Sequence, residues 1–139
     1  MGTSLKHTTE CFHQSRKITN TDPANTTIEI LTSSSSDRRV YGIAVFNDNN
    51  STQQLRVILV NGGSEHIAFT ISAALGAGAN GTANAKDLFG DSSAASMFQK
   101  QIDANGMPYF NLPAGWSIGA RYYVALSGTT TIHVFGETY

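Results

Sequence analysis

One short motif in the sequence has the spacing of a hydrolase nucleophile. Residues 115–119 read Gly-Trp-Ser-Ile-Gly and match the pattern G-x-S-x-G, in which the serine attacks a carbonyl carbon. That chemistry needs a strand before the serine, a helix after it, and a histidine held by a carboxylate. Here a strand is expected after Ser117, His133 lies in a further expected strand, and 139 residues are too few for that hydrolase fold. We therefore expect no catalytic residue and no enzymatic activity.

Metal and cofactor chemistry has two candidate segments. His7, Cys11 and His13 are metal-capable side chains close together in the sequence, with Glu10 among them. Zinc sites need three or four ligands on a fixed frame, and nothing in this polar segment anchors it, although sharing between symmetry-related copies would supply more ligands. Residues 76–81 (GAGANG) fit G-x-G-x-x-G, yet no helical period follows them. The sequence thus predicts neither a metal nor a cofactor.

Three aromatic residues near the end of the chain are the candidate contact residues. Trp116, Tyr122 and Tyr123 combine flat apolar rings with polar edges, which suits stacking on sugars and contact with a partner protein. In the alternative interpretation Trp116 packs at a corner of the domain and Tyr123 lies at a subunit contact. The sequence leaves the two interpretations open.

The composition excludes several classes of partner. Only 14% of the residues are charged, the formal net charge is −1 and 40% of the residues are hydrophobic, so a basic surface for nucleic acid is not expected. No apolar run is long enough to span a membrane or to form a signal peptide, and Cys11 is the single cysteine. These features predict a protein that is made in a cytoplasm without disulfides.

The hydrophobic pattern predicts one all-β domain preceded by an arm. Residues 1–25 are polar and aperiodic, which favours an extended N-terminal arm that becomes ordered against a neighbour. Residues 26–139 contain short alternating segments separated by Asn, Gly and Pro turns, as in a jelly-roll-like β-sandwich of roughly eight strands. A surface loop is expected at 72–84 and a short helical turn at 93–97.

Two of the expected strands have clear inward and outward faces. In residues 39–46, strict alternation places Tyr41, Ile43 and Val45 on one face and Val40 on the other. In residues 54–60, the inward positions are Leu55, Val57 and Leu59. The strand expected at 116–126 alternates in the same way.

The second half of the chain resembles virion proteins of tailed bacteriophages. The segments that carry the resemblance are DLFGDSSAASMFQKQIDANGMPYFNLPAGWSIGARYYVAL (87–126), with its Leu-Pro-Ala-Gly corner, and TTTIHVFGETY (129–139). The upstream segment RVYGIAVFNDNNSTQQLRVILV (39–60) fits the same pattern. The resemblance covers residues 26–139, and its motifs are structural corners that carry no catalytic residue.

The resemblance implies a structural role on the virion. The chain most resembles the small capsid decoration (cement) proteins. This resemblance implies a jelly-roll-like fold, a homotrimer, and binding across neighbouring major capsid protein subunits on the capsid surface. The alternative that it leaves open is a tail or head-fibre module that binds host-surface glycan.

Overall fold

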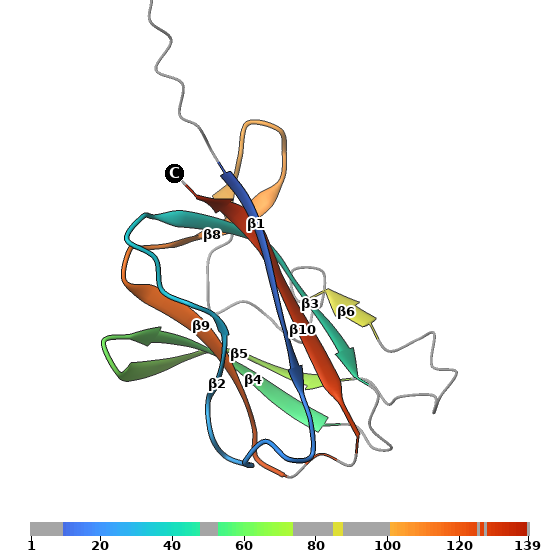
Figure 1. Cartoon of the computed structure of the whole chain (residues 1–139). Coiled ribbons are helices and arrows are strands. Elements are labelled where there is room, and N and C mark those ends of the chain that lie inside the picture. Colours follow the sequence, from blue (N-terminus) through green and yellow to red (C-terminus); the bar gives the residue numbers. More distant parts are fainter. Residues whose placement is uncertain are drawn as a thin grey trace, which may run out of the picture.

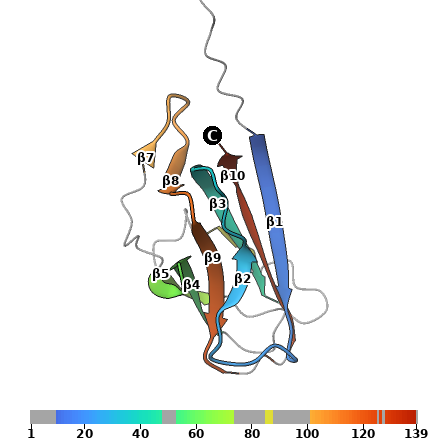
Figure 2. The same cartoon turned by 60° about the vertical axis from the view of Figure 1, so that its left-hand side comes forward.

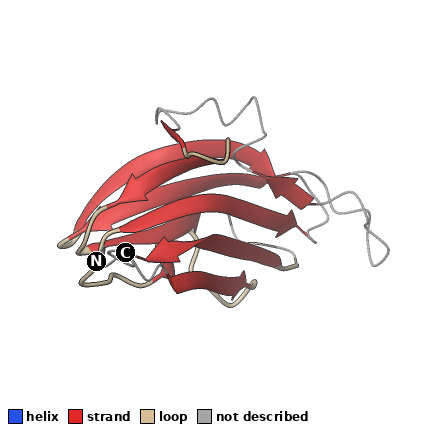
Figure 3. Ribbon diagram, turned by 90° about the horizontal axis from the view of Figure 1, so that it is seen from above, coloured by secondary structure: helices blue, strands red, loops and turns tan. Residues whose placement is uncertain are grey.

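The described part of the chain is built of β-strands. The computed structural model describes residues 10–47, 53–73, 85–87, 101–124, 126 and 128–138. Within these ranges the chain forms ten strands and no helix, and Figure 3 shows only strands and loops there. The strands are β1 (Glu10–Ile18), β2 (Ile28–Leu31), β3 (Arg38–Asn47), β4 (Gln53–Asn61), β5 (Ser64–Ala73), β6 (Ala85–Asp87), β7 (Gln101–Ile102), β8 (Pro108–Leu112), β9 (Trp116–Tyr122) and β10 (Thr130–Thr138).

The strands form two antiparallel sheets that face each other. The six-stranded sheet has the order β1-β10-β3-β8-β7, with β6 also paired to β3, and the four-stranded sheet has the order β2-β9-β4-β5. Figures 1 and 2 show the two sheets as separate layers. The expected all-β sandwich is confirmed, and the strands that the sequence did not predict are β1 and the short β6.

Strands from the first half of the chain pair with strands from the second half in reverse order. β1 pairs with β10, β2 with β9, β3 with β8, and β4 with β5. Successive pairs fall alternately in the six-stranded and the four-stranded sheet. The chain therefore follows the path of one long hairpin that is rolled up, and the tight turn at Gly62 and Gly63 (φ 57° and 88°) is its tip.

The hydrophobic core lies between the two sheets, because alternate side chains of each strand point inward. The predicted inward positions in β4 are confirmed, since Leu55, Val57 and Leu59 are all buried. The six-stranded sheet contributes Val40, Ile43, Val45, Leu112, Ile132 and Val134 to this core, and the four-stranded sheet contributes Ile30, Leu31, Leu55, Val57, Leu59, Ile118 and Ala120.

A β-bulge in β3 changes the predicted faces of that strand. Gly42 lies opposite Phe135 and Val40 opposite Gly136, so Tyr41 is the extra residue between two consecutive partners on β10. An extra residue shifts the inward-outward alternation by one position. Val40 is consequently buried together with Ile43, whereas strict alternation placed them on opposite faces.

The segment expected to be an arm contributes a strand of the sandwich. Nine residues of β1 pair with β10, from Glu10 opposite Thr138 to Ile18 opposite Thr130. Apart from Phe12 and Ile18, the side chains of β1 are exposed, so this strand leaves almost no hydrophobic pattern in the sequence. Backbone hydrogen bonds hold it at the end of the sheet. The sandwich therefore already includes residues 10–18 and does not begin at residue 26.

In the second half of the chain, one expected strand is shorter than predicted and two other predictions cannot be compared with the structure. β9 ends at Tyr122, and residues 123–124 bend away from it, so the strand expected at 116–126 is shorter than predicted. The helical turn expected at 93–97 and the glycine pattern at 76–81 lie outside the described residues.

Candidate interaction surfaces

The three predicted contact residues do not come together on one surface. Tyr122 is only 5% exposed and its hydroxyl lies 3.1 Å from the Thr130 hydroxyl, inside the core. Burial raises the pKa of the Tyr122 phenol to about 12. In this structure the alternation of β9 turns the Tyr122 side chain inward, so it is not presented on the surface to a partner or a sugar.

Trp116 and Tyr123 lie near opposite ends of β9. Trp116 packs against the core and its ring centroid is 5.4 Å from that of His66. Tyr123 is 38% exposed, and the Arg56 guanidinium lies 4.3 Å from the centre of its ring. At about 3.3 Å per residue, the six-residue span from 116 to 122 already separates them by roughly 20 Å. They form two separate surface features.

Several aromatic side chains contact one another on the outer face of the six-stranded sheet. His13 of β1, His133 and Phe135 of β10, and Phe46 of β3 form this aromatic–histidine patch. The alternation of β10 turns His133 and Phe135 outward, because Ile132 and Val134 beside them in the sequence point into the core. Phe46 and Phe135 are 46% and 39% exposed.

The rings of the patch are in contact with one another. The ring centroids of His13 and Phe135, which are directly opposite in register, are 4.8 Å apart and the rings are stacked. Phe46 meets His133 edge to face at 5.4 Å. Phe135 also covers Gly42, where a Cβ atom would lie 3.3 Å from its ring. The four side chains thus hold one another in place.

The two histidines of the patch also share a hydrogen bond. His13 Nε2 lies 2.8 Å from His133 Nδ1, and either ring can donate, depending on its tautomer. Burial, followed by the charge on His13, lowers the pKa of His133 below its ordinary value. His133 is therefore neutral at neutral pH.

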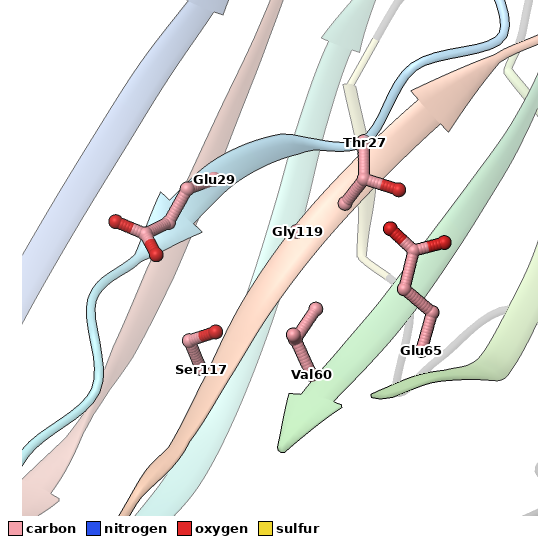
Figure 4. A pocket seen from close by; sticks show the side chains of 6 residues that line it. All are labelled: Thr27, Glu29, Val60, Glu65, Ser117 and Gly119. Carbon is pink, nitrogen blue, oxygen red and sulfur yellow. The ribbon is translucent and has the colours of Figure 1, made fainter. Parts of the chain in front are cut away.

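A polar depression lies on the outer face of the four-stranded sheet (Figure 4). Its volume is about 190 Å³, and the residues that line it are Thr27, Glu29, Val60, Glu65, Ser117 and Gly119. Arg121 forms an ion pair with Glu65 and donates a hydrogen bond of 2.8 Å to the Thr27 hydroxyl. The hydrogen bond from Thr27, and then Arg121, lower the pKa of Glu65. Binding pockets for small ligands usually hold about 300–1,000 Å³, so this depression is smaller than such a pocket.

Ser117 of the hydrolase-like motif lies in this depression. It is a residue of strand β9, and the chain around it is not the strand-to-helix elbow that a nucleophilic serine requires. Ser117 faces out from the four-stranded sheet and His133 faces out from the six-stranded sheet. Because packed sheets are about 10 Å apart, the core separates these two side chains and they cannot form a catalytic pair.

Of the metal-capable residues of the N-terminal segment, the structure describes Glu10, Cys11 and His13. Cys11 is exposed and lies opposite Glu137, two residues from His13 on the same face of β1. His7 lies outside the described residues. Among the residues that the structure describes, no three His, Cys, Asp or Glu side chains converge as a metal site.

Sequence reasoning missed the aromatic–histidine patch. The sequence contains part of the pattern that leads to the patch. Residues 130–135 alternate, which places His133 and Phe135 on one face of the strand and the apolar Ile132 and Val134 on the other face. What the sequence lacked was the order of the strands. The patch arises because β10 lies between β1 and β3, which come from distant parts of the chain.

Within the described residues, the chain has no helix that is both long and apolar enough to cross a membrane. The sequence matches no protein-family model and no curated protein at a significant level.

Proposed function

We propose that this protein is a non-enzymatic structural protein of a bacteriophage particle, most specifically a capsid decoration protein. In this proposal several copies, arranged as trimers, bind across neighbouring subunits of the major capsid protein and stabilise the head. The protein would be made in the host cytoplasm and act on the capsid surface.

The strand order supports a jelly-roll fold for such a protein. Leaving aside the short β6 and β7, eight strands pair as first with last, second with seventh, third with sixth and fourth with fifth, alternately in two sheets. That rolled-up hairpin is the arrangement of a jelly roll, which occurs in viral capsid proteins and in lectins. A shared fold alone does not establish a shared function, so the proposal depends on the surface.

The single observation that carries the proposal is the aromatic–histidine patch. Soluble monomers rarely expose large contiguous apolar patches, and such patches usually mark sites of interaction. Aromatic residues are enriched at protein interfaces, and a few buried rings usually contribute most of the binding energy. With Phe46 and Phe135 each more than a third exposed, the patch is suited to bury both rings against a partner protein.

Repeated copies would make weak contacts sufficient. A trimer that engages several capsid subunits at once turns later contacts into intramolecular ones, which raises the overall affinity without any new contact. The low share of charged residues suits interfaces of ordinary surface polarity.

A tail or head-fibre module that binds host-surface glycan is the second candidate function. The observation that favours it is the pair of Trp116 and His66, whose ring centroids are 5.4 Å apart at one end of the sandwich. The proposal that Trp116 binds sugar predicts that a Trp116→Ala protein loses glycan binding in an array measurement. Equal glycan signals from the wild type and this variant would exclude the site.

Particles that lack the protein provide the test of the decoration role. Wild-type chain, a Phe46→Ser/Phe135→Ser double variant and an Ile67→Ser control are added to such particles, and the bound copies are counted after sedimentation. We expect the wild type and the control to bind and the double variant to lose most of its binding, since Ile67 is exposed on the other sheet, outside the patch. Equal binding of all three proteins, with each folded by circular dichroism, would show that the patch is not the capsid contact.

A further inference from the structure

The His13–His133 pair has a feature that the interface role does not require. Two unprotonated imidazole nitrogens can bind one metal ion only if they lie close together on a stable frame. His13 Nε2 and His133 Nδ1 are 2.8 Å apart, and they come from strands joined by nine consecutive register pairs. The pairing of the two strands therefore fixes the backbone positions from which both side chains extend.

The two imidazole nitrogens favour some metal ions over others. The 2.8 Å between them is the length of their hydrogen bond, so it shows that both nitrogens can reach one ion and does not select its geometry. Imidazole nitrogen suits Zn²⁺, Cu²⁺ and Ni²⁺, and among the divalent first-row ions the affinity of such a site is highest for Cu²⁺. Two nitrogen ligands with the remaining positions open to oxygen ligands also suit the tetragonal geometry of Cu²⁺.

We propose that His13 and His133 together bind a divalent transition metal ion of tetragonal preference, with Cu²⁺ as the best-fitting ion. His13 contributes Nε2 and His133 contributes Nδ1, in neighbouring equatorial positions. Water or a group from another molecule occupies the remaining positions, which agrees with the lack of a third described ligand.

Binding requires a change of tautomer and no redox step. In the hydrogen-bonded pair, one of the two facing nitrogens carries the shared hydrogen. When the metal binds, that ring loses the hydrogen to water and regains one on its outer nitrogen, either His13 Nδ1 or His133 Nε2. Both rings then rotate away from the line of the hydrogen bond, so that both lone pairs point at the metal.

The surroundings allow a metal ion to enter. Phe135 stacks on His13 and Phe46 contacts the ring of His133 edge to face, while His13 is exposed and His133 is half-buried. The other titratable groups on this face are Cys11 and Lys17 of β1, Glu137 of β10, and Arg39 and Tyr41 of β3.

The test uses the untagged full chain with Cys11→Ser, because Cu²⁺ oxidises exposed thiols. Cu²⁺ is titrated into this protein and into versions that also carry His13→Ala, His133→Ala or His66→Ala, with binding measured calorimetrically. His66→Ala is the matched control, because His66 lies on the other sheet. We expect one Cu²⁺ per chain, binding weakened at least tenfold by either patch substitution, and less than twofold by His66→Ala.

Electron paramagnetic resonance of the Cu²⁺ form gives a second readout. The spectrum should be tetragonal with two equatorial imidazole nitrogens, and each patch substitution should remove one of them or both. The proposal is overturned if His13→Ala and His133→Ala bind Cu²⁺ as tightly as His66→Ala. It is also overturned if the spectrum shows fewer than two imidazole nitrogens in the parent protein.

Discussion

The two neighbouring tyrosines at the end of β9 have opposite environments. Tyr122 is buried with its hydroxyl beside Thr130, and Tyr123 is exposed beside Arg56. We expect Tyr122→Ala to lower the free energy of unfolding by about 3–5 kcal/mol because it leaves a cavity. Tyr122→Phe should cost about 0.5–1.5 kcal/mol for the lost hydrogen bond, and Tyr123→Ala less than about 1 kcal/mol. Urea unfolding of the three variants measures this order, and a larger loss for Tyr123→Ala would contradict it.

His133 should make stability depend on pH near neutrality. Its pKa in the folded chain lies below the ordinary value of 6.5, so the unfolded chain binds the proton more tightly. The part of the free energy of unfolding that depends on His133 is fully present above pH 6.5 and is lost as the pH falls below that value. Urea midpoints at pH 7.5 and 5.5 should fall more for the wild type than for His133→Gln. An identical fall in the two proteins would contradict the assignment to His133.

At the scale of the elements, strands with a hydrophobic face could be predicted and strands without one could not. β4 alternates cleanly, and its inward residues follow from the sequence. β1 has only Phe12 and Ile18 turned toward the core, and the backbone pairing with β10 that holds it depends on residues more than a hundred positions away. The bulge at Tyr41 is equally non-local, because it is defined by the register against β10.

The close packing of β10 against β1 and β3 leads to a prediction about the stability of a glycine variant. A Cβ atom at Gly136 would overlap the Arg39 carbonyl oxygen and lie 2.5 Å from the Phe12 ring. Backbone cannot move away cheaply, so we expect Gly136→Ala to lower the free energy of unfolding by at least about 2 kcal/mol. Gly42→Ala is the control, since its nearest neighbour is the movable ring of Phe135 at 3.3 Å and its cost should stay under about 1 kcal/mol. Equal thermal midpoints for the two variants would contradict this packing.

At the scale of the whole molecule, the all-β class followed from alternation and turn residues, but the surfaces did not. The patch needs β1, β10 and β3 side by side, and a local pattern does not contain that order. Trp116, Tyr122 and Tyr123 were selected by residue type, and their separation depends on where β9 ends and which face it buries. Residue type therefore identified the candidate side chains, and the topology decides which of them can act together.

The copy number of this chain in purified virus particles tests the central claim most directly. Quantitative mass spectrometry against the major capsid protein measures it. Decoration across neighbouring capsid subunits predicts many copies, in a simple ratio to the major capsid protein, because every equivalent joint in the shell offers the same binding surface. A chain that is absent from the particles, or present in only a few copies, would contradict a decoration role.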